Sequence, residues 1–297
     1  MNRRAWLLFV LLSVLWGIPY FLIKIAIEDL SPLVVVAGRI AVAALVLIPM
    51  AALRGTLGTL RGRMRVVAVL AVLHIVVPFL LITYGETHIS SSLTGLLIAI
   101  EPVAIALLLS RTEPLTTGRI VGLILGFTGV AVLVGLDVSG DRLGLLGAGM
   151  VLVAAVSYAL ATILVQRRAA DVPPEALAGG TTAISAVVLA PFALLALPER
   201  AVGAGAWASL GVLGVFCTAV AFLALYRLVG IAGSNRAGLV TYVNPVVAVL
   251  LGVALLDEHL GMSTVAGFAL VAAGCWLATR PIRPPAPSPV LVVVAEG

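Results

Sequence analysis

The chain has 297 residues, of which 62% are hydrophobic and only 10% are charged, and it carries a formal net charge of +5. A soluble globular protein has about a quarter of charged residues, so this composition excludes a water-soluble fold and indicates that lipid surrounds most of the surface. The apolar runs are continuous and do not alternate with polar residues, which excludes an outer-membrane β-barrel.

Ten apolar stretches follow one another along the chain, each near the roughly 20 residues that a helix needs to cross a bilayer. They cover residues 6–26, 33–53, 65–84, 91–110, 117–136, 144–165, 176–197, 205–226, 237–256 and 262–279. The first stretch is too long for the apolar region of a signal peptide, so we expect it to be retained. The predicted fold class is an all-α polytopic membrane protein with ten transmembrane helices.

The basic residues are distributed unequally between the two sides of these stretches. Only Lys24, Arg142 and Arg200 fall on one side, and the other Lys and Arg residues fall on the opposite side. By the positive-inside rule, both termini are expected in the cytoplasm, with the protein in the cytoplasmic membrane of a prokaryote. The net charge is therefore a topology signal, and no nucleic-acid partner is expected. Lys24 is expected to extend outward from its helix.

The second half of the chain repeats the first. The segment RTEPLTTGRIVGLILGFTGVAVLVG aligns with LDEHLGMSTVAGFALVAAGCWLATR, which matches Gly129 to Gly274, and upstream Pro102 matches Pro245 at a similar offset. With five helices per unit, the second unit enters the membrane from the opposite side, which is the inverted repeat typical of alternating-access carriers. The predicted divisions are a first repeat at 1–138, a second repeat at 139–280 and a disordered cytoplasmic tail at 281–297.

Three features together resemble the EamA-type permeases of the drug/metabolite transporter superfamily. They are the start LWGIPYFLIKIAIEDLSPLVVVAGRIAVAAL, the Glu-Leu elements after the fourth and ninth stretches, and the glycine-spaced fifth and tenth stretches. The resemblance covers residues 6–280. It implies a ten-helix, exporter-type carrier of small metabolites, commonly amino acids or related compounds, and it supports an arginine at position 39.

Two charged residues lie inside apolar stretches. Counting 1.5 Å per residue from the same face, Glu101 lies about 15 Å deep and Arg39 about 9 Å deep. Ionisable groups at such depth usually mark a transport pathway. One interpretation is structural: Arg39 and Glu101 pair with each other, or a protonated Glu101 bonds a free carbonyl. The functional interpretation is that Arg39 binds a substrate carboxylate and Glu101 binds a proton or a substrate ammonium group.

Several further residues are candidates for a substrate-binding cavity. The polar and aromatic candidates are Trp16, Tyr20, His74, Tyr158, Tyr242 and Asn244, which is the repeat counterpart of Glu101. The indole N–H of Trp16 needs a partner in lipid, and His74 is either a proton relay or a satisfied core histidine. Prolines that remove helical hydrogen bonds are expected to kink helices around the cavity. They are Pro19, Pro78, Pro102 and Pro245.

The sequence lacks a catalytic constellation, a nucleotide-binding motif and a metal-ligand spacing, so neither an enzyme nor a cofactor is expected. The favoured hypothesis is a secondary active transporter that moves small metabolites by alternating access, with export favoured over import. The alternatives are a multidrug or organic-cation exporter and a channel-like facilitator. Expected partners are a small-molecule metabolite, membrane lipid and, through Glu101, protons. The spacing GLILG at 122–126 is explained by close helix packing in a monomer or by a homodimer contact.

Overall fold

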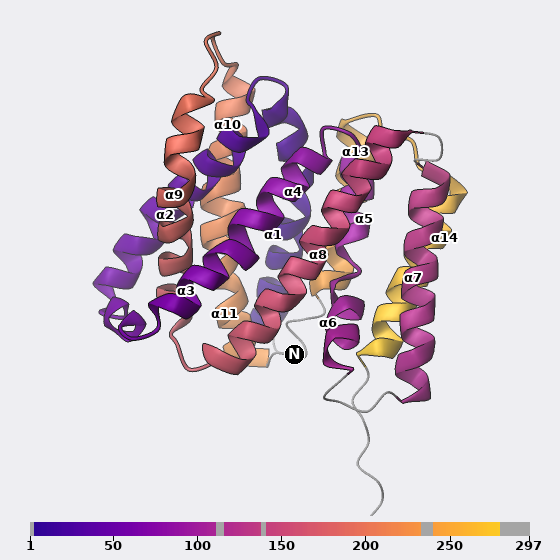
Figure 1. Cartoon of the computed structure of the whole chain (residues 1–297), viewed down its shortest axis with the longest axis horizontal. Coiled ribbons are helices and arrows are strands. Elements are labelled where there is room, and N and C mark those ends of the chain that lie inside the picture. Colours follow the sequence, from indigo (N-terminus) through magenta and orange to yellow (C-terminus); the bar gives the residue numbers. More distant parts are fainter. Residues whose placement is uncertain (1–2, 111–115, 138–140, 233–239, 280–297) are drawn as a thin grey trace, which may run out of the picture.

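The computed structural model describes residues 3–110, 116–137, 141–232 and 240–279 (Figure 1). Within these ranges all regular structure is helical, eight segments are long and apolar enough to cross a membrane, and two shorter apolar helices follow. The elements are α1 (Arg3–Ile27), α2 (Pro32–Leu53), η1 (Leu57–Leu60), α3 (Met64–Leu70), η2 (Ala71–Val76), α4 (Val77–Gly85), α5 (Ser91–Ile98), α6 (Glu101–Leu109), α7 (Thr117–Asp137), α8 (Arg142–Arg168), α9 (Pro174–Leu195), α10 (Ala204–Gly214), η3 (Val215–Val220), α11 (Ala221–Ala232), α13 (Val240–Leu255) and α14 (Met262–Ala278). The predicted all-helical membrane protein is confirmed, and the tail at 281–297 lies outside the described residues.

Local sequence signals explain where several helices begin. The hydroxyl of Ser90 accepts a hydrogen bond from the backbone N–H of Leu93 at 3.1 Å, and the carboxylate of Asp141 accepts one from Leu143 at 2.9 Å. Such caps satisfy backbone donors that a helix leaves unpaired in its first turn. Pro32 opens α2, where its missing N–H costs nothing. These starts lie close to the predicted boundaries.

Large apolar side chains cover much of the outside of the bundle. Leu53, Val187 and Leu195 are 90%, 74% and 89% exposed, respectively. A soluble protein rarely shows so continuous an apolar exterior, whereas a bilayer solvates it without cost.

Helices from the two halves of the chain alternate in space. The first-half helix α1 packs against the second-half helices α10, α11 and α13. Likewise α2 packs against α9, and α4 packs against α8. Figure 1 shows the indigo helices of the N-terminal part lying among the orange helices of the second half. The two halves therefore share one buried interior.

The helices α7 and α14 approach each other through glycines. A Cβ atom at Gly129 would lie 2.6 Å from the backbone nitrogen of Val271, and one at Gly122 would lie 2.5 Å from that of Ala278. Only glycine allows two backbones to come this close. The spacing that begins at Gly122 is therefore explained by packing inside one chain, because α14 covers the face on which a homodimer contact was considered.

Each half contains a π-helical turn, η2 in the first and η3 in the second, and their starts are 144 positions apart. A π turn disturbs the regular backbone pairing and often marks a functional position. Hydroxyl groups supply the replacement hydrogen bonds here. The hydroxyl of Ser157 donates to the carbonyl oxygen of Leu73 at 2.7 Å, and that of Thr218 donates to the carbonyl oxygen of Leu213 at 2.8 Å.

The fourth predicted stretch is interrupted, because α5 ends at Ile98 and α6 begins at Glu101. The thiol of Cys275 in α14 donates to the carbonyl oxygen of Ala99 inside the break, at 3.1 Å. A neighbouring helix thus satisfies a carbonyl group that the broken helix leaves free.

The four prolines divide into two pairs. Pro78 and Pro102 each lie in the first turn of a helix, α4 and α6, directly after irregular backbone. Pro19 and Pro245 lie inside the continuous helices α1 and α13. The difference is physical: a first turn tolerates a missing N–H, so a helix can restart at proline. Pro102 follows the break between α5 and α6, whereas its repeat counterpart Pro245 does not interrupt α13. The kinks expected around a cavity stay a prediction.

Candidate functional site

The guanidinium group of Arg39 lies in the interior of the bundle, with the residue 8% exposed. Its Nε donates to the hydroxyl of Thr218 in η3 at 3.0 Å, and its central carbon lies 4.2 Å from the centroid of the Phe79 ring. A desolvated cation over an aromatic ring gains about 2 kcal/mol. Among the described residues no carboxylate lies within ion-pair distance of Arg39, and its two Nη groups donate no hydrogen bond. A buried cation therefore keeps two donor groups for a ligand.

Glu101 is the first residue of α6, where the helix dipole favours a negative charge. One carboxylate oxygen accepts a hydrogen bond from the hydroxyl of Thr162 in α8 at 3.1 Å. No ion pair joins Glu101 to Arg39 within 4 Å, so the structural ion pair considered from the sequence is absent from this structure.

Two tyrosines connect these charged groups. Tyr20 of α1 and Tyr158 of α8 each lie within electrostatic range of both Arg39 and Glu101. Arg39 and Glu101 thus share neighbours without pairing with each other.

Aromatic side chains extend this site. The ring of His74 makes edge-to-face contacts with Tyr158 and Phe222, at centroid distances of 5.7 and 6.1 Å, and Trp16 contacts Phe222 at 6.5 Å. Together with Arg39 and Tyr20 these residues form what we call the central cluster: Trp16, Tyr20, Arg39, His74, Tyr158 and Phe222. Five of the predicted site residues belong to it, and Glu101 lies beside it.

Two predicted site residues lie elsewhere. With its amide nitrogen facing backbone carbonyls, Asn244 donates to Val240 at 2.9 Å and to Ser13 at 3.2 Å, so it joins α13 to α1. The hydroxyl of Tyr242 lies 3.3 Å from that of Thr279, just after the end of α14. In the described part of the chain, no hydrogen bond or ring contact joins either of them to the central cluster. Their role in substrate binding stays a prediction.

The sequence analysis did not single out Phe79, Thr162, Thr218 or Phe222. Each is an ordinary residue of an apolar stretch, and only tertiary contacts with Arg39, Glu101 or His74 distinguish it. No local pattern could have identified them. Thr218 lies in the π turn η3 and Phe222 follows it closely, a position that becomes visible only in the folded chain.

Glu86 was also missed, and it follows Gly85, the last residue of the third span. It is fully buried, and neither oxygen of its carboxyl group has a hydrogen-bond partner. The ammonium group of Lys24 donates to the backbone carbonyl of Glu86 at 2.6 Å, and the expectation that Lys24 extends outward from its helix stays a prediction. Burial raises the pKa of Glu86 well above its usual range, against opposing effects of Lys24 and Arg39 and with a further increase from Glu258.

A second carboxylate, that of Glu258, joins two elements at one end of the bundle. We call this end the far face; it carries the connections α1–α2, α4–α5 and α13–α14, opposite the N-terminus (upper side of Figure 1). One oxygen of Glu258 accepts from the N–H and hydroxyl of Ser91 at 2.8 and 2.9 Å. The other accepts from those of Ser92 at 3.0 and 2.5 Å. These four bonds tie the α13–α14 connection to the start of α5.

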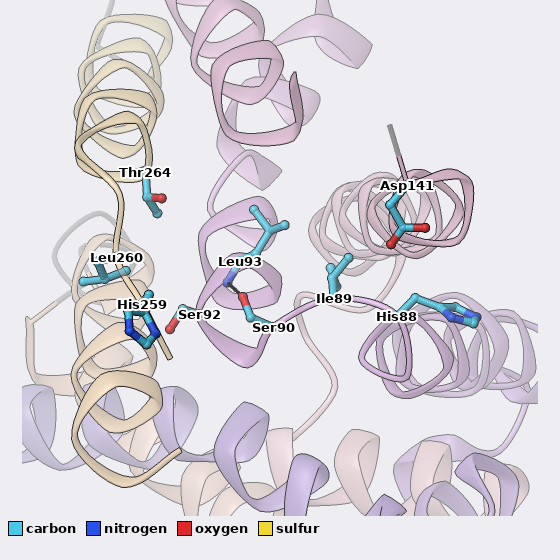
Figure 2. Close-up of a pocket in the computed structure, with 9 residues that line it drawn as sticks. All are labelled: His88, Ile89, Ser90, Ser92, Leu93, Asp141, His259, Leu260 and Thr264. Carbon is cyan, nitrogen blue, oxygen red and sulfur yellow. Dashed lines mark hydrogen bonds between the residues drawn. The ribbon is translucent and has the colours of Figure 1, made fainter. Parts of the chain in front are cut away.

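A pocket of about 270 Å³ opens on the same far face. Figure 2 shows His88 and Asp141 at one end of it and His259 with Ser92 at the other. The two histidines therefore do not converge on a common ligand. No group of three metal-ligating side chains occurs in the described ranges. This pocket lacks the residues of the central cluster.

Comparison with known proteins identifies this chain as similar to membrane transporters. The model of the EamA-like transporter family matches residues 3–135 and again 145–280. An uncharacterized transporter of Archaeoglobus fulgidus is 27% identical over 283 residues, which are 93% of this chain and 99% of that protein. The uncharacterized inner membrane transporter YedA of Escherichia coli K12 is 29% identical over 84% of this chain and 82% of its own. A solved crystal structure at 21% identity has a TM-score of 0.66 and covers 94% of this chain and 97% of its own, which indicates the same fold.

Proposed function

Since this chain belongs to the EamA-like transporter family and is a membrane transporter, we propose that it is a secondary carrier of small metabolites that bear a carboxylate, such as amino acids or related compounds. The observation that carries this proposal is the buried guanidinium group of Arg39, which pairs with no carboxylate of the described chain. An unpaired charge inside a membrane protein costs free energy unless a ligand of opposite charge binds to it. The two unused Nη groups match a carboxylate in bidentate geometry.

The proposed architecture is ten transmembrane helices in two inverted repeats, residues 1–138 and 139–280. The double family match and the π turns 144 positions apart support it. The basic residues support cytoplasmic termini by the positive-inside rule. The inner-membrane location in the printed name of the E. coli relative supports placement in a cytoplasmic membrane.

In this proposal the substrate lies across the central cluster. Its carboxylate binds Arg39, and a substrate ammonium group or a proton binds Glu101, with Tyr20 and Tyr158 between these charges. The Glu258 bonds to Ser91 and Ser92 hold the far face closed, so opening that face requires α5 to separate from the α13–α14 connection. Breaking one contact set and forming another at the opposite face is how inverted repeats alternate access.

Export is the proposed direction, following the family resemblance. A multidrug or organic-cation exporter is the weaker alternative, because the unpaired buried charge of Arg39 is positive and repels cations. A channel-like facilitator is weaker because the far face is closed by direct hydrogen bonds.

The test is counterflow in proteoliposomes that hold the purified full-length chain. Vesicles preloaded with a mixture of amino acids are compared with vesicles preloaded with the corresponding decarboxylated amines. Saturable exchange of labelled amino acids, inhibited by simple carboxylic acids, is the expected result. Faster exchange of the amines would support the cation exporter, and flux without saturation or counterflow would support the channel.

A further inference from the structure

The carboxyl group of Glu86 has no role in the substrate site described above. It is fully buried, and neither oxygen meets a donor or an acceptor within hydrogen-bond distance. A buried polar group without a partner costs about 1–3 kcal/mol, and more when it is charged. A position that keeps such a group therefore needs a ligand or an alternative conformation that satisfies it.

We infer that Glu86 is a proton-binding site that is linked to the substrate site through Arg39. This inference rests on the proposed function, because it names the coupling ion of the same carrier. It also separates two tasks that the sequence analysis assigned jointly to Glu101: the proton binds Glu86, and Glu101 stays available for the substrate ammonium group.

The surroundings of Glu86 suit a proton. The charged and titratable groups that face it are Tyr20 and Lys24 of α1, Arg39 of α2 and Glu258 of the α13–α14 connection. The helix α8, which also packs here, brings the side chain of Val151 and the backbone carbonyl of Gly147 close to Gly85, and neither of these groups titrates. His88, from the same connection as Glu86, lies in the far-face pocket with Asp141. Lys24 and Arg39 favour the ionised form of Glu86, whereas the carboxylate of Glu258 favours the protonated form. A change in the charge at Arg39 therefore shifts the protonation of Glu86.

The sign of the linkage follows from charge. Arg39 stabilises the ionised form of Glu86, and a substrate carboxylate bound at Arg39 would cancel that stabilisation. Glu86 then takes up a proton when the carboxylate binds, and by reciprocity the proton strengthens carboxylate binding. Proton and substrate move together. In the proposed direction, export of the metabolite down its own gradient carries protons outward with it.

The first experiment needs no substrate. Infrared spectra of the full-length protein in lipid nanodiscs are recorded from acidic to alkaline pH, and the carbonyl band of a protonated carboxylic acid is followed. The difference between wild type and Glu86→Gln should contain a band that titrates well above the range of a free carboxyl group. Glu199→Gln, which changes an exposed glutamate on the far face, is the matched control and should leave this high-pH band unchanged. Identical spectra for wild type and Glu86→Gln, or a band that shifts with Na⁺ at fixed pH, would overturn the proposal.

The second experiment adds the amino-acid mixture and measures proton uptake with a pH indicator dye. Wild type should take up protons on binding, and Glu86→Gln should take up none while it retains counterflow. Glu86→Asp should restore uptake with a shifted pH midpoint, which separates titration from structural damage. Undiminished uptake in Glu86→Gln contradicts the inference. If wild type shows no counterflow with any amino acid, the proposed function fails, and the infrared titration still decides whether Glu86 binds the proton.

Discussion

The two halves of this transporter use equivalent positions differently. Arg39 of the first half extends to Thr218 of the second half and keeps two donor groups unused. Its repeat counterpart Thr181 bonds only to carbonyl oxygens of its own helix, at 2.8 and 3.1 Å. Glu101 opens the broken helix α6, whereas its counterpart Asn244 lies inside the continuous helix α13. The charges therefore serve no requirement of the architecture.

Other features occur in both halves. The π turns η2 and η3 lie at matching positions, and so do the glycines of α7 and α14, which let these two helices pack closely. Features that both halves share are thus explained by the common helix arrangement. Arg39 and Glu101, which occur only in the first half, are instead the residues that we expect to bind the ligand. Four measurements can break or sharpen this contrast.

The largest effect is expected for Arg39→Gln. It removes two charge-assisted hydrogen bonds to a carboxylate, a loss of about 3 kcal/mol, or about 100-fold in affinity. Thr181→Val, which removes only bonds within α9, should leave affinity within about threefold. Initial counterflow rates against substrate concentration give both values. Equal losses in the two variants would show that Arg39 acts through packing.

Gly129→Ala should destabilise the fold by about 1–3 kcal/mol, because its Cβ meets the backbone of α14 and neither helix can yield locally. Its repeat counterpart Gly274 should respond in the same way. The control is Gly149→Ala in α8, which meets no atom within 4 Å and should gain up to about 1 kcal/mol from helix propensity. Thermal unfolding in detergent compares the three. A tolerated Gly129→Ala would mean that α7 and α14 are not held at this distance.

Glu101→Gln should raise the KM for an amino acid about 10-fold, since a charged hydrogen bond contributes about 1.5 kcal/mol more than a neutral one. The KM for the analogous acid without an ammonium group should not change. Asn244→Ala should lower stability by about 1 kcal/mol through its lost contact with α1 and leave substrate preference intact. Transport assays with the amino acid and with the analogous acid that lacks the ammonium group measure both KM values. An equal effect on both substrates would argue against an ammonium site at Glu101.

The smallest effect is expected at the exposed ion pair between Arg63 and Asp171, whose oxygen and nitrogen atoms lie 2.6 Å apart. The hydrogen bond from Arg63 lowers the pKa of Asp171, so its stabilisation is present above about pH 4 and is lost as the pH falls through the lowered value. Asp171→Asn should lower Tm slightly at pH 7, and the difference should vanish in acid. A larger Tm difference between wild type and Asp171→Asn in acid than at pH 7 would contradict this pH dependence.

Most of the fold was predictable because it follows from the solvent. Apolar stretches near 20 residues long predict helices in lipid, and the observed bounds of α2 and α9 lie within a few residues of the predicted ranges. The site was predictable in part. Arg39 and Glu101 stand out because a charge in an apolar run is rare, but the sequence could not say whether they pair.

By itself the sequence determined the helices, their approximate limits and which positions carry charge, because each depends on residues close together in the chain. Only the tertiary structure decided that Arg39 meets Thr218 across 179 positions and that Lys24 turns toward the backbone of Glu86. It also decided that the carboxyl group of Glu86 is buried without a partner. Which side chains are buried, and which groups they contact, depends on which helix faces pack together. Helices that are apolar on nearly all sides carry little sequence information about which of their faces will pack.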